Sequence, residues 1–546
     1  MSKYFSYMDF FSLCFGNSCW NRTQNHSKRT HRTAIHFKQQ FIYRNFKEDP
    51  FSSRTPPSNK TKNDIVQMKG ARIILLTAIL IFPFLIYGES TRPNILFLSI
   101  DDLRPELNCY GIDYIHSPHI DKLASEGILF DRHYVQAPTC GASRYALLTG
   151  KYGSPGNSAL FDRAAQLEDG KALVDPSLPA WLRMHDYETV SIGKVSHHPG
   201  GLGGTEWNDP NEVEMPQSWD RILMPVGAWQ HPKGAMHGLA NGEIRRDAST
   251  MDVYQSHDGP DESYPDGLIA ETADEELQRL AEKGKPFFLA VGFIRPHLPF
   301  GAPKRFMEYY QDLVLPPILY PDRPEGRSTW HRSSEFMRYN RWDRDPNEDA
   351  EFADLVRKHY AACVSYIDTQ VGKVIQRLDS LGLSENTIII LWGDHGWHLG
   401  EHGIWGKHSL FEESLRSPLI ISYPTKIKPK TRSDSIVETV DIFPTITHLA
   451  NIPTPDFLNG QLLPLESNPE FGEDGEAVSY HRNYITIRNN RYRLIVHKDG
   501  YTELYDHDSA ARETLNIAES HPDVVARMIA RLRQLAPDKM SVYSIN

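Results

Sequence analysis

Residues 92–106 read RPNILFLSIDDLRPE, and this stretch decides the fold. The apolar run from Ile95 to Ile100 predicts a buried β-strand. The run stops abruptly at two adjacent carboxylates, Asp101 and Asp102. A buried strand that ends in two acidic residues places charged carboxylates at the edge of a hydrophobic core.

The same alternation of strand and helix patterns continues along the chain. Strand patterns occur in ETVSIGKVSHHPGG (188–201), KPFFLAVGFIRPHLPF (285–300) and ENTIIILWGDHGWHLGEHG (385–403). Helical spacing occurs in HIDKLASEGILF (119–130) and YAACVSYIDTQVGKVIQRLDSLGL (360–383). This order predicts an α/β layered fold with a largely parallel sheet, in which ligands bind outside the carboxyl ends of the strands.

Two other regions have a different character. Residues 198–267 are rich in Gly, Pro and Asp, and we interpret them as long loops that shape the rim of a cleft. From about Ala477 the pattern changes to short strands and then to a helix over about Pro522 to Leu535. We therefore predict a catalytic domain over residues 92–465 and a small C-terminal α+β subdomain with an antiparallel sheet over residues 466–546.

The N-terminal region has the layout of a secretory leader placed inside the chain. Residues 68–88 read MKGARIILLTAILIFPFLIYG, a basic start followed by an apolar run that is short for a membrane span. We predict a signal peptide here, with an uncleaved signal anchor as the alternative, and no stable membrane span. Residues 1–67 are then expected to be an extension outside the mature protein.

Charge and cysteine usage narrow the class of protein. From Glu89 onward 46 Lys/Arg face 66 Asp/Glu, which disfavours nonspecific nucleic-acid binding and means that an anionic substrate needs a locally positive pocket. After Met68 only Cys109, Cys140 and Cys363 remain, too few for a disulfide scaffold. The same part has no N-x-[ST] acceptor, which favours a bacterial periplasmic or extracellular protein.

Two acidic pairs at strand ends indicate a metal site. Asp101-Asp102 ends one predicted strand and Asp394-His395 ends another. Either pair alone is also consistent with a solvated turn or a helix cap. Together they favour a divalent cation, because like charges held close need a positive partner. Mostly oxygen ligands suit calcium or magnesium better than zinc.

Cys140 stands at a predicted helix start in QAPTCGASRYALLTG (136–150). It could be a buried inert thiol or a thiolate activated by the helix N-terminus. The stretch CGASR also fits the pattern Cys-x-(Pro/Ala)-x-Arg, with LLTG following. With these motifs the chain from about Arg92 onward resembles the type I sulfatases of the alkaline phosphatase superfamily, and within them most of all the iduronate-2-sulfatase branch.

The resemblance implies an alkaline-phosphatase-like α/β/α sandwich and a defined chemistry. A formylglycine-generating enzyme would oxidise Cys140 to formylglycine (3-oxoalanine) before folding, and the aldehyde hydrate would be the nucleophile. One Ca²⁺ would be held by the residues of the two acidic pairs and an oxygen of the modified cysteine. Arg144 would hold that oxygen by charge-assisted hydrogen bonds. The metal ligands are thus expected to be Asp101, Asp102, Cys140, Asp394 and His395.

Four further residues receive roles from the same resemblance. Lys194 and Lys407 would neutralise the sulfate oxygens, and His297 would protonate the departing sugar oxygen. His197 would act as the base that expels sulfate. The family pattern Gly-Lys-Val-x-His favours His197 over its neighbour His198. Taken without the resemblance, each histidine is equally well a surface or core residue.

The sequence thus predicts an exported sulfatase that acts on a sulfated saccharide. Two alternatives stay open: a formylglycine-dependent phosphonate or phosphodiester hydrolase, and a noncatalytic protein that binds sulfated glycans with Cys140 unconverted. The resemblance suggests a 2-O-sulfated uronate as substrate, but the loops over residues 198–267 and 480–493 diverge from that branch.

Overall fold

A computed structural model describes residues 92–170, 174–203, 207, 209–466 and 475–544. The predicted N-terminal extension (1–67) and signal peptide (68–88) lie outside the described residues, so both stay predictions. The boundary predicted between residues 465 and 466 also stays a prediction.

The centre of the described chain is an eight-stranded sheet in the order β14-β2-β13-β10-β1-β8-β3-β6. Every neighbouring pair is parallel except the two pairs that involve β13, so β13 alone runs antiparallel. The prediction of a largely parallel sheet is confirmed. The strands are β1 (Asn94–Ile100), β2 (Ile128–Tyr134), β3 (Glu188–Gly193), β6 (Arg221–Leu223), β8 (Phe287–Phe293), β10 (Thr387–Gly393), β13 (Leu419–Ser422) and β14 (Thr431–Glu438).

Strand β1 lies in the middle of this sheet and is buried on both faces. Ile95 and Phe97 belong to one hydrophobic core, whereas Leu96 and Leu98 belong to the other. Alternate side chains of a strand point to opposite faces, so a continuous apolar run fits a strand covered on both sides.

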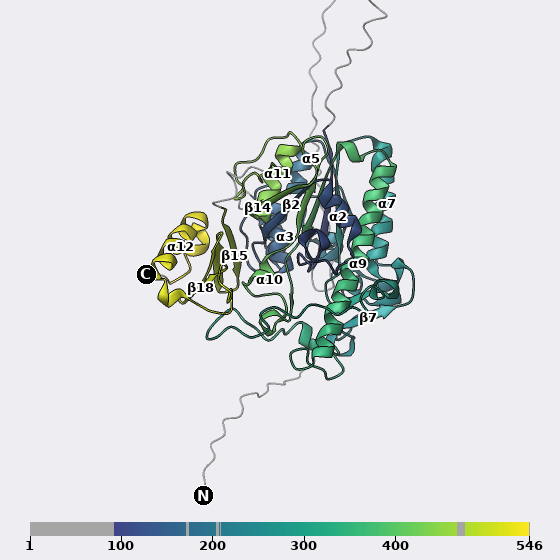
Figure 1. The fold of residues 1–546 in the computed structure, drawn as a ribbon. Helices are drawn as coiled ribbons and strands as arrows, with labels where there is room; N and C mark the ends of the chain where they lie inside the picture. Colours follow the sequence, from purple (N-terminus) through teal and green to yellow (C-terminus); the bar gives the residue numbers. More distant parts are fainter. Residues whose placement is uncertain (1–91, 171–173, 204–206, 208, 467–474, 545–546) are drawn as a thin grey trace, which may run out of the picture. The chain divides into compact units, whose positions relative to one another are not determined.

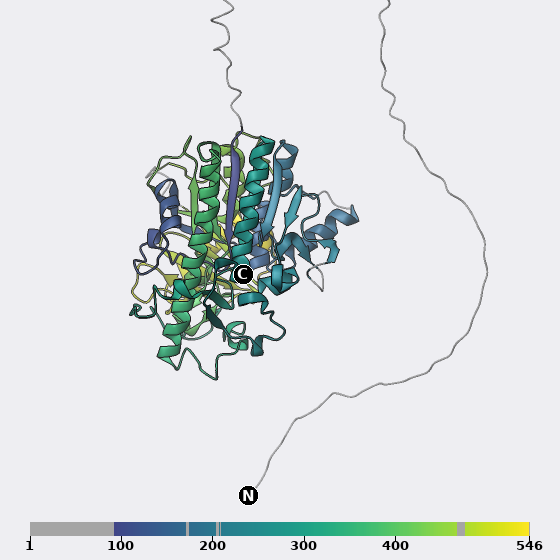
Figure 2. The ribbon, with the colours of Figure 1, turned by 90° about the vertical axis from the view of Figure 1, so that its right-hand side faces the viewer.

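Helices cover both faces of the sheet. In Figure 1, α7 and α9 lie on one side and α3 and α11 on the other; Figure 2 shows α7 and α9 in front of the strands. The two hydrophobic cores have the same division. This α/β/α arrangement confirms the predicted fold class. The helices are α2 (Pro118–Ser125), α3 (Cys140–Thr149), α4 (Ala159–Asp169), α5 (Leu178–Met184), α7 (Pro265–Lys283), α9 (Ala350–Ser380) and α11 (Ile442–Leu449).

One predicted helix is shorter than its pattern suggests. The spacing over residues 119–130 reads as a single helix, but α2 ends at Ser125 and β2 begins at Ile128. Gly127 lies between them, where an added Cβ atom would be 2.3 Å from the carbonyl oxygen of Ile421 on β13. Close packing of this turn against the sheet therefore ends the helix.

In its described residues, the segment predicted as long loops, 198–267, forms several 3-10 turns, short strands and one short α-helix before α7. The strands and the helix are β4 (Leu202–Gly203), β5 (Asp209–Val213), β6, α6 (Pro232–Met236) and β7 (Tyr254–His257). Other short elements accompany the main sheet: β9 (Phe300–Pro303), α8 (Lys304–Met307), β11 (His398–Leu399), β12 (Trp405–Gly406) and α10 (Glu412–Leu415).

The C-terminal part forms a four-stranded antiparallel sheet in the order β15-β16-β17-β18, as predicted. Helix α12 packs on one face of it, on the left of Figure 1. The opposite face packs on the main domain, where Ile495 joins a core with Tyr134 and Phe411. The elements are β15 (Ala477–His481), β16 (Tyr484–Arg488), β17 (Tyr492–His497), β18 (Thr502–Asp506), α12 (Pro522–Leu535) and α13 (Pro537–Met540). Over the described residues, no helix is both long and apolar enough to cross a membrane.

A buried ion-pair network joins the two sheets. Arg493 of β17 is fully buried and contacts Glu412 of α10 at 2.7 Å and Glu513 at 2.5 Å. Tyr134, at the end of β2, donates a hydrogen bond to Glu412 over 2.8 Å. The buried guanidinium holds the pKa of both carboxyls below the usual range, to about 2 for Glu513.

We expect Arg493→Met to lower the free energy of unfolding by about 3–5 kcal/mol, because it leaves two buried carboxylates without their cation. Denaturant unfolding followed by tryptophan fluorescence measures the change. The matched control is Arg491→Met, whose side chain is 53% exposed and pairs with Asp506. Its expected effect is below about 1 kcal/mol.

The loss of unfolding free energy in Arg493→Met should become smaller as the pH falls. Carboxyls with a depressed folded-state pKa stabilise the protein fully above their unfolded value near 4.5, and this stabilisation disappears as the pH falls toward about 2. The gap between wild type and Arg493→Met should therefore narrow as the pH falls below about 4.5. A gap that is constant down to pH 3 would contradict the ion-pair explanation.

Candidate active site

The site is built on the carboxyl ends of adjacent parallel strands. Asp101 and Asp102 follow β1 directly, and Asp394 and His395 follow β10. The two strands pair in register up to Ile100 and Gly393, so Asp101-Asp102 and Asp394-His395 emerge at one edge. The backbone N–H of Asp102 donates to the Asp394 carboxylate over 2.8 Å.

Cys140 begins α3 and is only 3% exposed. Its Sγ lies 3.2 Å from Lys407 Nζ and 3.3 Å from His395 Nε2. At the next residue, Gly141, an added Cβ atom would be 2.4 Å from Asn157 Cα, which explains the glycine. Burial and the nearby Asp101 raise the pKa of the Cys140 thiol well above its ordinary value. The unmodified residue is therefore a neutral thiol, which weighs against a thiolate nucleophile.

The residues around Cys140 fit a divalent cation. Asp101, Asp102, Cys140 and His395 each place one potential ligand atom within 4.8 Å of all the others. Asp102 Oδ2 is buried and has no hydrogen-bond partner among the described residues. Burial and the neighbouring carboxylates raise the pKa of Asp102, and they raise that of Asp394 to about 7. A bound divalent cation that prefers oxygen ligands, such as Ca²⁺, would stabilise the ionised form of these buried acids.

Three buried side-chain cations balance the carboxylates. Lys194 forms an ion pair with Asp101, and Lys407 Nζ donates to Asp102 over 2.7 Å. Arg144 contacts Asp101 at 3.0 Å and Asp394 at 3.1 Å. All three cations come from different segments and converge on one cluster.

Arg144 is expected to bind an oxygen of residue 140, but in the structure it contacts carboxylates, backbone carbonyls and Ser99. Its guanidinium also donates to the carbonyls of Lys194 and Val195 and to Ser99 Oγ. These bonds direct it to the ends of β1 and β3, where it holds the carboxylates in place. That it also binds an oxygen of residue 140 stays a prediction.

Asp394 sits behind the other acids. One of its oxygens accepts from the backbone of Asp102, and the other faces Arg144. His395 Nε2 lies 3.6 Å from this second oxygen. The role of Asp394 as a metal ligand therefore stays a prediction. Asp394 does not belong to the tighter group that Asp101, Asp102 and His395 form with Cys140.

His297 and His197 face the same cavity as Cys140. His297 Nδ1 donates to the Leu298 carbonyl over 2.8 Å, which leaves Nε2 free toward Glu335 at 3.6 Å. Burial, with Lys407 and Lys194, lowers the pKa of His297 well below the ordinary value. Burial and the nearby Lys194 also lower the pKa of His197. The Nδ1 atom of His197 has no hydrogen-bond partner among the described residues.

His198 is placed differently from His197. Its ring lies against Phe161, and its Nδ1 is 3.5 Å from Glu214. It is not among the residues that line the cavity with Cys140. This geometry agrees with the preference for His197 as the base.

The cavity has a volume of about 700 Å³ and extends well beyond Cys140. Several of its lining residues could not be predicted singly from the sequence, because most lie on segments without a regular pattern. The segments 198–267 and 480–493, which the sequence marks as substrate-determining loops, contain six of them, and no sequence signal indicates Asn157, Glu335 or Arg338. The missed residues include Asn157, Trp207, Lys233, His237, Arg245, Arg246, Glu335, Arg338 and Arg482.

In the part of the chain that the structure describes, two other groups of His and Glu residues are close enough to suggest a metal, and both contain Glu513. Its carboxylate already accepts from Arg493, His507 and the backbone N–H of Glu412. These groups are explained by the buried ion pairs that hold the C-terminal sheet. The cluster at Cys140 differs in that all four of its residues are buried, whereas Glu412 and Glu413 in the other groups are partly exposed; Asp102 Oδ2 and Glu413 Oε2 are both without a hydrogen-bond partner among the described residues.

Comparison with known proteins identifies the family. The profile of the family described as Sulfatase matches residues 93–452, and the profile described as N-sulphoglucosamine sulphohydrolase, C-terminal, matches residues 400–538. The chain is 31% identical to Iduronate 2-sulfatase of Homo sapiens over 405 residues, which is 66% of this chain and 70% of that protein. It is 27% identical to N-acetylglucosamine-6-O-sulfatase of Bacteroides thetaiotaomicron, covering 79% of this chain and 83% of the relative.

Solved structures share the fold. One, of BT4656 in complex with its substrate D-glucosamine-2-N,6-O-disulfate, aligns with a TM-score of 0.62 at 22% identity. The alignment covers 82% of this chain and 99% of that one. The phosphonate monoester hydrolase of Agrobacterium radiobacter aligns with a TM-score of 0.64 at 20% identity, over 82% and 96% of the two chains. The chain thus belongs to the sulfatase family, as a type I sulfatase of the alkaline phosphatase superfamily and a sulfuric ester hydrolase.

Proposed function

We propose that this sulfatase removes sulfate from sulfated saccharides, with Cys140 converted to formylglycine as the nucleophile. The observation that carries the proposal is the position of Cys140 Sγ, within 3.3 Å of both Lys407 Nζ and His395 Nε2 at the edge of the carboxylate cluster. Relatives named for sulfated sugars, Iduronate 2-sulfatase and N-acetylglucosamine-6-O-sulfatase, support a saccharide substrate.

The formylglycine hydrate would supply a nucleophilic hydroxyl and a second hydroxyl from which sulfate can be expelled. Because Cys140 is 3% exposed in the folded protein, a formylglycine-generating enzyme would have to act before folding. A calcium ion held by Asp101, Asp102, Asp394, His395 and residue 140 would supply positive charge that lowers the pKa of a bound hydroxyl.

The side chains of the site would act on opposite ends of the sulfate ester. Lys194 and Lys407 would hold the sulfate oxygens by charge-assisted hydrogen bonds. His297, with Nδ1 fixed by the Leu298 carbonyl, would present Nε2 to the departing sugar oxygen and would donate a proton there as the imidazolium, which the bound anionic sulfate ester would stabilise against its lowered pKa. His197, neutral because its pKa is lowered, would accept the proton that is lost when sulfate leaves.

The site of action is proposed from the leader sequence. Residues 68–88 would direct export, which places the enzyme in the periplasm or outside the cell. The lack of an N-x-[ST] acceptor after Met68 supports a bacterial host.

Mass spectrometry of the peptide that bears Cys140, from protein made in its own host, tests the nucleophile. We expect the cysteine side chain CH₂–SH to be replaced by an aldehyde and its hydrate. Cys140→Ala should lower aryl sulfate turnover by at least about 10⁴-fold, as removal of a nucleophile does elsewhere. Cys109→Ala, a thiol on a loop away from the cavity, is the matched control and should keep full activity.

The same assay separates the alternatives. Faster turnover of a phosphodiester than of the sulfate ester would favour the phosphonate or phosphodiester hydrolase. An unconverted Cys140 with no turnover would favour a noncatalytic glycan-binding protein.

Calcium should stabilise the wild type, and Asp102→Asn should remove this effect. Free calcium at 100 times its Kd raises the free energy of unfolding by about 2.7 kcal/mol. Thermal melting with and without calcium detects this change. Without calcium, Asp102→Asn should itself be less stable, because it leaves the buried Lys407 ammonium without its carboxylate partner, so each protein's calcium response is read against its own calcium-free melting temperature. Exposed Asp113→Asn is the control, and an equal calcium response in Asp102→Asn would refute this ligand.

His197→Gln should lower steady-state kcat by about 10²–10⁴-fold while the first release of aryl alcohol continues. The reason is that His197 is assigned to sulfate expulsion, after the ester bond has broken. Stopped-flow absorbance should show a burst of one equivalent per site followed by slow turnover. His198→Gln, which alters the pair with Glu214, should show no such burst.

A further inference from the structure

The rim of the catalytic cavity gathers cationic side chains that have no acidic partner. Over the described residues, four of them line the cavity and form no ion pair with any carboxylate: Lys233, Arg246, Arg338 and Arg482. They are exposed and come from separate segments of the chain. In a chain with a net charge of −11, this concentration is not expected from composition.

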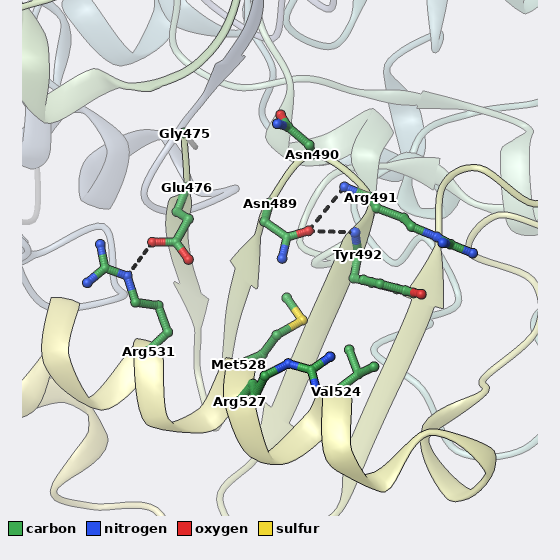
Figure 3. A pocket seen from close by; sticks show the side chains of 10 residues that line it. All are labelled: Gly475, Glu476, Asn489, Asn490, Arg491, Tyr492, Val524, Arg527, Met528 and Arg531. Atoms are coloured by element: carbon green, nitrogen blue, oxygen red, sulfur yellow. Dashed lines mark hydrogen bonds and ion pairs between the residues drawn. The ribbon is translucent and has the colours of Figure 1, made fainter. Parts of the chain in front are cut away.

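A second basic cavity provides the contrast. It has a volume of about 500 Å³ and lies between the C-terminal sheet and α12 (Figure 3). Its three arginines are all paired: Arg531 with Glu476, Arg527 with Asp523, and Arg491 with Asp506. Arginines at that surface are neutralised within the protein, whereas those at the catalytic rim are not.

A fifth cation at the rim is held in a defined position. Arg245 donates to the Tyr339 hydroxyl over 2.7 Å, and its guanidinium lies 5.7 Å from the centre of the Tyr339 ring. These contacts hold the side chain before any ligand arrives, so less conformational entropy is lost on binding. Tyr339 is itself buried and directly follows Arg338.

His237 lies next to the reacting end of the cavity that Arg245 also lines. The rings of His237 and His297 are 5.5 Å apart, and His237 Nδ1 is buried without a partner among the described residues. His237 also lines the cavity. A saccharide whose leaving oxygen faces His297 would pass His237 within the cavity that Arg245 lines.

The acids that line the cavity do not cancel this charge. Asp247 accepts hydrogen bonds from the backbone and side chain of Ser249, each at 2.9 Å, and keeps its negative charge, but it is a single carboxylate beside five rim cations. Glu335 faces the catalytic side, 3.6 Å from His297 and 3.9 Å from His408. The rim beyond His237 is left with a net positive charge.

We infer that this rim is an anion-binding subsite, with Arg245 and Arg338 as specificity-determining residues. It binds a second anionic group, a carboxylate or another sulfate, on the same saccharide as the sulfate that is cleaved. The inference rests on the proposed function for the identity of the ligand. Hydrogen bonds to charged groups contribute enough for a 10- to 100-fold preference, roughly, over a substrate without that group.

Binding to Cys140→Ala protein with calcium present, measured by calorimetry, tests the subsite without turnover. Three matched disaccharides carry the same sulfate ester: one has a uronate carboxylate, one has this group reduced to an alcohol, and one has the alcohol plus a second sulfate. We expect the neutral form to bind about 10- to 100-fold more weakly than at least one anionic form. Which anionic form binds tightly identifies the group as carboxylate or sulfate.

The double variant Arg245→Gln/Arg338→Gln should remove most of that preference. Arg527→Gln, on the paired basic cavity of Figure 3, should leave it intact. Equal affinity for all three disaccharides would overturn the inference, and so would a double variant that weakens all three equally. Circular dichroism checks that each variant is folded.

Sulfate release by the wild type from an aryl sulfate tests the proposed function separately. Turnover without any preference among the disaccharides would overturn the subsite alone. A preference without turnover would support the subsite and remove the catalytic proposal.

Discussion

Three carboxylates are buried together at the carboxyl edge of the central sheet, and much of the surrounding structure serves to make that burial tolerable. Asp101, Asp102 and Asp394 are fully inaccessible to solvent. Burying a charge without an opposite charge nearby costs more free energy than any single contact contributes to stability. Arg144, Lys194 and Lys407 supply the compensation, and each must be delivered by a different part of the fold.

This constraint explains why the site lies where it does. Parallel strands bring their carboxyl ends to one edge, so the residues that follow β1, β3 and β10 meet there without long connections. Helix α3 adds Cys140 from above this edge, with its N-terminus directed at the cluster. Even with three cations, Asp102 keeps one oxygen without a partner, which is the feature that best fits a divalent ion.

The charge of the cavity changes with distance from Cys140. Near the sulfur atom the cations are paired with acids and held rigidly, as expected for groups that position a reaction. Toward the rim they are exposed and unpaired, as expected for groups that await an anionic ligand. The C-terminal sheet contributes Arg482 to this rim, and its buried Arg493 anchors it to the main domain.

Local sequence was sufficient for much of this architecture. The apolar run of β1, its abrupt end at Asp101 and Asp102, and the motif around Cys140 act over a few residues, where pattern and chemistry are directly readable. The C-terminal strands and α12 were predictable for the same reason, since hydrophobic periodicity reflects which face is buried. The split between α2 and β2 was not, because it depends on the contact of Gly127 with a strand nearly 300 residues later.

The sequence by itself determined the fold class, the family and the residue types at the reaction centre. Only the tertiary structure decided how they are used: that Arg144 holds carboxylates, that His197 rather than His198 faces the cavity, and that rim cations from four segments converge. Side chains on loops without periodicity carry no local signal of their neighbours. Their meeting is set by packing between distant parts of the chain, which no short stretch of sequence contains.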